Sequence, residues 1–519
     1  MAASFLFQPT TIGRSLVFYL PAAAGYRVIG LARGVLLAWL MTEQQFGLLQ
    51  IALLAVTILF PLCGVGLHEG FARYLPLHEA AGTLRPFLRR ALPLTAVLVA
   101  LFCILVAAAS PLVARGFFVP IDESAPTVPR ETSLALARLT AAGTLVLIAY
   151  MLVLAMLRGL RLFRALSVME LIGHTLFTLL AVAVAWAGYR NSQAILVVYC
   201  IAYGAVTALF ALLLARAVGQ IEPGEMFTAP ELPIADERPL RRMLRFSAWA
   251  ALGAVLWQTL QYYPMWYLQK TQGPEVTAVY GAVRLLAQAV LIAAVSVVTV
   301  VQTAVTRTWE AEGIEPADRQ LALAHKVTAL VMLAGCGLLY AAGPWVMRIF
   351  PAEYAAGLPI VPLVLMFFMV GGHLAFLAVH FILIEKPRHT FAIWSVGLAG
   401  SVLFAAWLVR PGQETHAALT AAAWAGILGI SLAAVLAGVV LRAEGRRLGR
   451  GIAMLVALTY VLALPILWVT VILTSALAAA VMSRAVFDAE DKKIVRAKTR
   501  ALFDGVRSAI GRKRSEEAR

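Results

Sequence analysis

The sequence predicts an all-α protein with many membrane-spanning helices, and three observations lead to this fold class. Hydrophobic residues make up 61% of the 519 residues and charged residues only 13%, whereas a soluble domain carries about 25% charged residues. The apolar residues form blocks of about 18–30 residues, and a helix needs about 20 to cross a bilayer. Short charged stretches separate these blocks.

Twelve apolar blocks are each expected to form one span, at about 16–41, 45–68, 91–114, 134–156, 167–188, 193–215, 245–268, 277–303, 324–347, 358–383, 391–409 and 418–441. A further apolar block, 451–482, contains Pro465 near its middle. This block is long for one span and short for two. It predicts either a hairpin of two short helices or one long kinked helix, and therefore 14 spans or, alternatively, 13.

The distribution of Lys and Arg predicts the orientation. With the N-terminus in the cytoplasm, the inner loops hold 21 of these residues and the outer loops six, as the positive-inside rule requires. The chain after Arg484 is also basic, so we expect both termini in the cytoplasm and an even span count of 14. The net charge of +16 thus reflects orientation in the inner membrane and does not indicate nucleic-acid binding.

Two similar hairpins predict an internal repeat. Gly47 precedes Arg73 by 26 residues, and Gly281 precedes Arg307 by the same interval. Each hairpin starts a run of six spans, so the halves should be parallel repeats around a central cavity. The expected parts are an N-terminal six-helix lobe 1–217, a cytoplasmic linker 218–244, a C-terminal six-helix lobe 245–441, a helical hairpin 442–483 and a basic amphipathic cytoplasmic tail 484–519.

Ionisable residues at bilayer depth are costly unless they face a cavity or a partner. The sequence places three arginines there, Arg27, Arg33 and Arg284, and we predict that they bind a phosphate or pyrophosphate group, which suits the guanidinium fork. Arg27 and Arg33 are six residues apart, about 240° around a helix, so both cannot point squarely into one cavity. Candidates for ion or proton coupling are Glu69, Glu170 and His174.

Other polar residues lie in the predicted seventh and tenth spans. Gln258, Gln261, Tyr262 and Tyr267 in the seventh span combine hydrogen-bonding groups with flat rings, a mixture that suits sugars but also an outer aromatic belt. His373 and His380 share one helix face and are interpreted as interior histidines satisfied by hydrogen bonds. The four cysteines lack metal-ligand spacing, so no metal or cofactor is expected.

Two other functions fit the sequence less well than transport of an anionic substrate. A multidrug or cation antiporter would need intramembrane carboxylates, but arginine outnumbers acid at depth. A membrane glycan polymerase would need a large outer catalytic loop. The longest outer loop, which carries Asp122, Glu123 and Glu131, is short. The chain also lacks the G-x-x-x-x-G-K-[ST] phosphate loop, so we expect a transporter and no enzyme.

Short motifs resemble the multidrug/oligosaccharidyl-lipid/polysaccharide (MOP) exporter superfamily, and within it the O-antigen and polysaccharide flippases. The first-span segment 27–33, with its two arginines, is similar to a motif of the related lipid II flippases, in which the position of Arg33 is functional. Tyr280-Gly281-Ala282-Val283-Arg284 resembles the eighth-span motif with another functional arginine. Glu69-Gly70 matches an acidic-glycine pair. Pro61-Leu62 departs from the lipid II branch, which has arginine there.

This resemblance implies a flippase that moves an undecaprenyl-pyrophosphate-linked oligosaccharide or polysaccharide precursor from the inner to the outer leaflet by alternating access. It implies membrane lipids and the lipid-linked glycan as partners, with glycan-assembly enzymes as further candidates. We expect a monomer in the cell inner membrane.

The predicted orientation can be tested by cysteine labelling. In Glu123→Cys, an impermeant maleimide should react from outside intact cells, because position 123 falls in an outer loop. In Leu240→Cys, it should react only after the inner face is exposed. Labelling in the reverse pattern would overturn the orientation.

Overall fold

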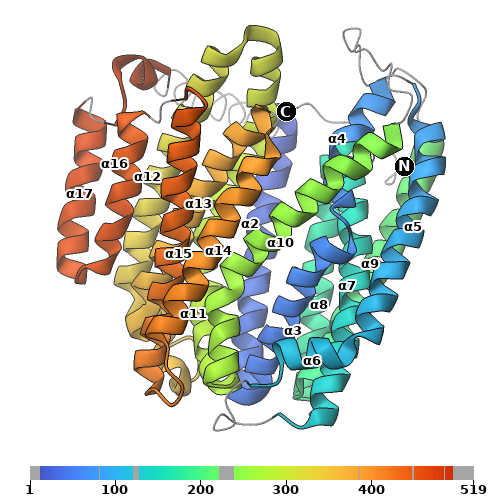
Figure 1. Cartoon of the computed structure of the whole chain (residues 1–519), viewed down its shortest axis with the longest axis vertical. Coiled ribbons are helices and arrows are strands. Elements are labelled where there is room, and N and C mark those ends of the chain that lie inside the picture. Colours follow the sequence, from blue (N-terminus) through green and yellow to red (C-terminus); the bar gives the residue numbers. More distant parts are fainter. Residues whose placement is uncertain are drawn as a thin grey trace, which may run out of the picture.

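The computed structural model describes Phe7 and residues 12–80, 82–120, 128–220, 239–384, 386–446, 449–483 and 486–494. Every regular element within these ranges is a helix, so the predicted all-α fold class is confirmed. The helices run roughly along one axis in two side-by-side groups (Figure 1). Most of the predicted tail and most of the linker lie outside the described residues.

The N-terminal half comprises α2 (Ile12–Leu40), α3 (Glu43–Cys63), α4 (Leu67–Ala80), α5 (Leu84–Ala108), α6 (Ser110–Phe117), α7 (Arg130–Gly159), α8 (Phe163–Trp186) and α9 (Ser192–Gln220). The C-terminal half comprises α10 (Pro239–Thr271), α11 (Pro274–Glu312), α12 (Ile314–Met347), η1 (Ala352–Ile360), α13 (Val361–Leu383), α14 (Pro387–Leu408) and α15 (Thr415–Ala443). The chain then forms α16 (Arg450–Thr459), η2 (Tyr460–Ala463) and α17 (Ile466–Met482).

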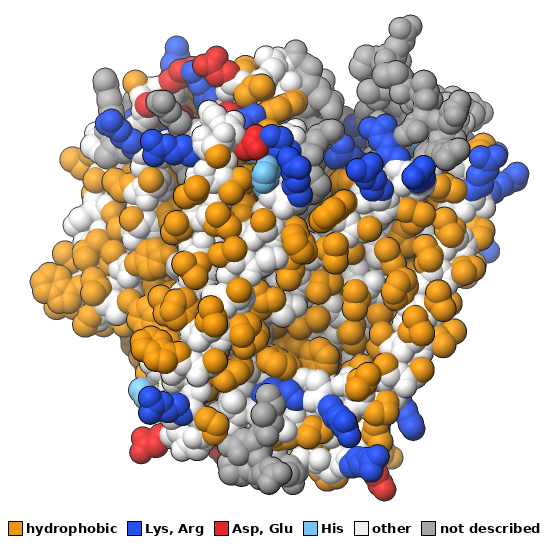
Figure 2. All heavy atoms as spheres, viewed as in Figure 1, with side chains coloured by type: hydrophobic (Ala, Val, Ile, Leu, Met, Phe, Trp, Pro, Cys, Tyr) orange, Lys and Arg blue, Asp and Glu red, His pale blue; other side chains and the backbone are white. Residues whose placement is uncertain are grey.

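Eleven helical segments within the described residues are long and apolar enough to cross a membrane, and two shorter apolar helices follow at 450–463 and 466–480. Helix α10 is 33 residues long and coincides with the predicted seventh span, but its Gln and Tyr residues lower its hydropathy. Hydrophobic side chains form a broad belt between two ends rich in Lys and Arg (Figure 2). The total of 14 spans remains a prediction.

The block 451–482 forms the hairpin, one of the two alternatives predicted. Helix α16 and the short η2 precede Pro465, and α17 starts immediately after it, because proline lacks the N–H that a continuous helix needs. A Cβ added to Gly451, at the start of α16, would lie 2.5 Å from the carbonyl oxygen of Val486. The two ends of the hairpin therefore lie together.

The predicted second span, 45–68, ends earlier than expected, and a further helix that was not predicted follows it. Helix α3 ends at Cys63, and α4 begins at Leu67. Between them Val65 and Gly66 have positive φ angles of 47° and 60°, a conformation that costs least for glycine. A Cβ on Gly66 would lie 2.2 Å from the carbonyl oxygen of Ser247, so the break brings α4 against α10.

The two halves use the same packing pairs. Helix α2 packs on α8 as α10 packs on α14, and α3 packs on α7 as α11 packs on α13. Likewise α7 contacts α9 as α13 contacts α15, and α8 contacts α9 as α14 contacts α15. This correspondence is what the predicted six-helix repeat requires.

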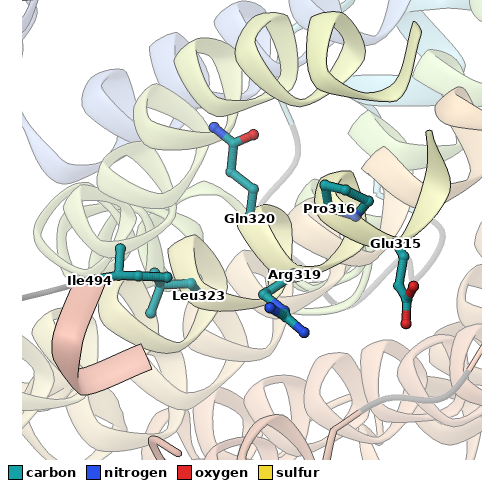
Figure 3. Close-up of a pocket in the computed structure, with 6 residues that line it drawn as sticks. All are labelled: Glu315, Pro316, Arg319, Gln320, Leu323 and Ile494. Atoms are coloured by element: carbon teal, nitrogen blue, oxygen red, sulfur yellow. The ribbon is translucent and has the colours of Figure 1, made fainter. Parts of the chain in front are cut away.

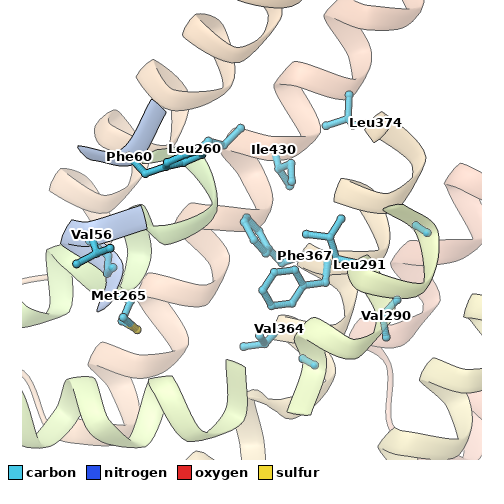
Figure 4. Close-up of a cluster of buried hydrophobic side chains, with 14 of the residues drawn as sticks. Val56, Phe60, Leu260, Met265, Val290, Leu291, Val364, Phe367, Leu374 and Ile430 are labelled. Carbon is cyan, nitrogen blue, oxygen red and sulfur yellow. The ribbon is translucent and has the colours of Figure 1, made fainter. Parts of the chain in front are cut away.

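Helices α3 and α11 join the halves, and they run in the same direction. A Cβ on Gly47 would lie 2.0 Å from the carbonyl oxygen of Pro274, and one on Gly281 would lie 3.2 Å from Gln50. Glycine at both repeat positions thus lets the backbones approach closely, as small residues do between membrane helices. Apolar side chains of α3, α10, α11, α13 and α15 fill the adjoining core (Figure 4).

One end of the molecule, which we call the basic end, carries the start of α2 and the segment 486–494 (Figure 1). At the opposite end, donors of one half bind backbone carbonyl groups of the other. Trp39 Nε1 donates to Ile349 (2.6 Å) and Trp266 Nε1 to Gly116 (2.8 Å). Lys270 Nζ donates to two carbonyl groups near the end of α6. The halves are therefore in contact at this end.

The close approach of α3 and α11 yields a stability prediction. Gly47→Ala should destabilise this arrangement by about 1–3 kcal/mol, the usual cost of overpacking, because rigid backbone faces the added methyl group. Thermal unfolding of the purified protein should show a lower midpoint. Gly204→Ala is the matched control, since a Cβ there would meet nothing within 4 Å. Equal midpoints for both variants would contradict the prediction.

Candidate functional site

Arg284 on α11 lies in a buried aromatic niche of the C-terminal half. Its side chain is held by the rings of Tyr262 from α10 and Phe368 from α13, whose centroids lie 3.6 Å and 5.5 Å from the guanidinium carbon. Nη1 donates to Gln288 Oε1 at 3.1 Å. Nε and Nη2 are buried without an acceptor. Unpaired buried donors are costly, and binding of an anion by this guanidinium group remains a prediction.

Arg33 on α2 occupies a similar position in the N-terminal half. Its guanidinium carbon lies 4.3 Å from the ring centroid of Phe177 on α8. Tyr199 and Tyr203 of α9 are close enough to interact electrostatically with it. Its Nη1 is buried without a hydrogen-bond acceptor. Each half thus buries one arginine against aromatic rings, a cation–π arrangement that stabilises a desolvated charge.

His174 of α8 connects the remaining polar groups of the N-terminal half. Its ring stacks on Tyr26 at a centroid distance of 4.8 Å, and its Nδ1 lies 3.4 Å from the Tyr203 hydroxyl. Both Arg27 and Arg33 act on it electrostatically. Long side chains therefore bring both arginines to one residue despite their separation of about 240° around α2.

Glu170, one turn before His174, interacts with Arg27 and Tyr26, and its Oε2 is buried without a hydrogen bond. The structure thus groups two of the three predicted coupling residues. Glu69 is separate from them, because it lies half-exposed in the first turn of α4, with Oε1 3.6 Å from His68 Nε2.

Arg33 and Arg284 lie on either side of the contact between the halves. A Cβ on Gly34 would meet Leu285 Cδ1 at 2.6 Å, so the residues immediately after the two arginines touch. Each guanidinium group nevertheless stacks on rings of its own half. We predicted that both face one central cavity. In this conformation each is enclosed by its own aromatic cluster, and sharing of a cavity remains a prediction.

Of the four predicted sugar-contacting residues, Tyr262 is the one that stacks on Arg284. Gln258 is half-buried one helical turn before it, and Gln261 is buried. Tyr267 packs elsewhere, with Tyr263 at 5.8 Å and in a small apolar cluster formed with α14 and α15. Gln288 was not predicted as a site residue, although a polar residue four positions after Arg284 lies next to it on the same helix face.

Phe177 and Phe368 were also missed, because a phenylalanine in an apolar span carries no distinguishing pattern. Within the described residues, no group of three His, Cys, Asp or Glu side chains could hold a metal ion.

Comparison with solved structures shows which known fold the chain shares. The fold resembles an outward-facing multidrug resistance MATE family transporter of the MOP superfamily, with a TM-score of 0.62 and 15% identity over 87% of this chain and 98% of that chain. The inward-facing form of such a transporter gives a TM-score of 0.59, with 15% identity over 83% and 95% of the two chains. A Pyrococcus furiosus MOP transporter, described by the reverse polarity of its binding pocket, gives 0.62 with 16% identity over 87% and 98%.

The chain is thus a multi-pass membrane protein with the fold of the MOP transporters. Residues 17–309 match the family described as "Polysaccharide biosynthesis protein", and the chain belongs to that family. No curated protein gives a significant match.

Proposed function

We propose that this transporter is a flippase for an undecaprenyl-pyrophosphate-linked oligosaccharide or polysaccharide precursor. The observation that carries the proposal is a pair of arginines, the half-buried Arg33 and the buried Arg284, which retain buried N–H donors without acceptors. The family match to polysaccharide biosynthesis proteins supports a glycan substrate.

The chemistry of these arginines favours a phosphate-bearing substrate. A buried charge is costly unless an opposite charge and hydrogen bonds compensate it. A guanidinium group offers several donors in one plane and binds phosphate oxygens in pairs. Two such groups on either side of the Gly34–Leu285 contact are suited to the two phosphates of a pyrophosphate once the halves separate. The exposed face of an aromatic ring such as Tyr262 suits the sugar.

The contacts between the halves suit alternating access. At the opposite end the inter-half bonds run from side chains to backbone carbonyl groups, so no buried carboxylate is left unpaired when they break. In the proposed cycle the substrate enters from the cytoplasmic leaflet at the basic end, and the opposite end then opens. The inner membrane location, cytoplasmic termini, monomeric state and contacts with glycan-assembly enzymes belong to this proposal.

A cation antiporter is the second candidate, and Glu170 favours it because its Oε2 is buried without a hydrogen-bond partner. However, Arg158 and Arg27 both act electrostatically on this carboxylate, so the local charge does not attract a cation. The description of the Pyrococcus furiosus transporter by a pocket of reverse polarity is consistent with different pocket charges in this superfamily.

Arginine substitutions test the proposal. Arg33→Ala and Arg284→Ala should each abolish glycan export and weaken binding of a lipid pyrophosphate by the purified protein, because the charge-assisted hydrogen bonds are lost. Arg284→Lys should be impaired, since an ammonium group lacks the planar fork. Arg410→Ala, at an exposed position, is the control and should behave as the wild type.

Folding of each variant is checked by the amount of protein in the membrane and by its elution as a single species. If both alanine variants export glycan and bind the lipid normally, the arginines do not hold the substrate. If they instead lose efflux of a cationic drug, the antiporter function is supported.

A further inference from the structure

A chain of polar side chains crosses the interior of the C-terminal half, away from Arg284. His325 Nε2 of α12 lies 2.9 Å from His373 Nδ1 of α13. His373 Nε2 lies 3.1 Å from Thr459 Oγ1 of α16, and this hydroxyl donates to the Leu455 carbonyl oxygen at 3.2 Å. His325, His373 and Thr459 are all buried, with exposed fractions of 2%, 1% and 0%.

The hydrogen bonds that join His325, His373 and Thr459 can all be assigned in one direction. When His325 Nε2–H donates to His373 Nδ1, the second ring is neutral with its proton on Nε2, which donates to Thr459. The Thr459 hydroxyl in turn donates to the backbone. In this arrangement His325 Nδ1 carries no proton. A proton can therefore be added at Nδ1 without breaking any hydrogen bond of the chain.

One contact of His325 would stabilise the charged form that such a proton creates. The ring of Phe376 stacks on the imidazole at a centroid distance of 4.7 Å and an interplanar angle of 4°. A cation is attracted to the face of an aromatic ring. The positive charge is also shared with His373 through the N–H···N bond, which spreads it over two rings.

The same two helices contribute a second pair of titratable side chains, which lies nearer the basic end. His380 Nδ1 is 3.4 Å from Asp318 Oδ1. Asp318 precedes His325 by seven residues on α12, and His380 follows His373 by seven on α13. The two pairs are thus two helical turns apart, about 10 Å. Asp318 is 32% exposed and His380 12%, so this outer pair meets solvent.

Charged and titratable groups on the elements that carry these side chains include Asp318 and Lys326 of α12, His380 of α13 and Arg450 at the start of α16. Arg446 and Asp491 belong to the adjoining segments. Arg446 pairs with Asp318, and Lys326 Nζ lies 2.7 Å from Asp491 Oδ2. These pairs largely cancel one another. His380 interacts electrostatically with His325 and is the imidazole of this set that lies between Asp318 and the inner pair along α13.

The segment 486–494 packs against α12 near the Asp318–His380 pair. Asp491 binds Lys326, the residue after His325, and Glu490 Oε1 lies 2.6 Å from Arg319 Nη1. Beside Arg319 a pocket of about 310 Å³ lies between the start of α12 and Ile494 (Figure 3). The sequence predicts a basic amphipathic cytoplasmic tail over 484–519. The part that is described docks on α12, and residues 495–519 lie outside the described residues.

We propose that His325 and His373 form a proton-binding site, which takes up one proton from the basic end through Asp318 and His380. The proton adds to His325 Nδ1, and no other covalent bond forms or breaks. Proton binding needs no glycan, whereas its effect on transport rests on the proposed flippase function. Because α13 carries both His373 and Phe368, the ring beside Arg284, the site is connected to the substrate-binding arginine by one helix.

The experiment is nitrogen NMR of the full-length protein in lipid nanodiscs, with its eight histidines labelled with ¹⁵N. In the wild type, a scalar coupling between two ring nitrogens should reveal the N–H···N bond at neutral pH. On acidification, a signal of a charged imidazole should appear that is lost in His325→Gln. The control His416→Gln, at an exposed position, should keep it.

Absence of the N–H···N coupling in the wild type, or an unchanged set of charged imidazole signals in His325→Gln, would overturn the proposal. His373→Gln is the second variant and should also lose the signal. If His325→Gln does not fold, the wild-type coupling and His373→Gln decide the result.

Transport is measured separately in proteoliposomes containing a fluorescent lipid-linked glycan. The flipping rate should depend on the pH at the basic end in the wild type, and this dependence should flatten in His325→Gln. A pH profile that stays the same in this variant contradicts a role of the site in transport. If the histidine signals behave as expected but no lipid is flipped, the proton site stands and the flippase function fails.

Discussion

The structure depends on the cost of placing a charge in a medium that cannot solvate it. A charged side chain within a bilayer needs a cavity, a partner or a polarisable surface. Arg284 and Arg33 satisfy this need incompletely, because aromatic rings cover their faces while some of their N–H groups have no acceptor. Unpaired cationic donors in the interior lower the stability of the folded protein. An anionic ligand that completes their hydrogen bonds would remove this cost. Under the proposed function, for a chain of the polysaccharide biosynthesis family, that ligand is a lipid pyrophosphate.

The contact between the halves is built so that it can open. Helices α3 and α11 approach through Gly47 and Gly281, and few charged groups hold them together. The bonds at the opposite end join side-chain donors to backbone carbonyl groups, which water can replace. By contrast, the hydrogen-bonded series from His325 and His373 of the C-terminal half to Thr459 of the hairpin ties the hairpin to that half. The C-terminal half and its hairpin are therefore expected to move as one unit.

The sequence predicted the helical class and the approximate spans because hydrophobic length determines both. It left Pro465 ambiguous, since a proline permits a kink or a turn, and only packing selects the hairpin. It did not predict the turn at Val65 and Gly66 or the helix α4 that follows, because the packing of α4 against α10 depends on the fold. The three arginines could be located by depth, but the direction of their side chains depends on partners such as Phe177 and Phe368 on distant helices. His373 was correctly interpreted as hydrogen-bonded, yet its partner His325 lies 48 residues away and becomes its neighbour only through the fold.

The central claim is that buried arginines carry a pyrophosphate lipid across the bilayer. The most direct measurement uses proteoliposomes with fluorescent undecaprenyl-pyrophosphate-linked oligosaccharide in the leaflet that adjoins the basic end, and an impermeant quencher added on the other side. The account predicts that lipid becomes accessible to the quencher with the wild-type protein, and that excess unlabelled lipid pyrophosphate competes with this movement. If the labelled lipid stays in its leaflet while the same vesicles exchange a cationic drug for protons, the account is contradicted.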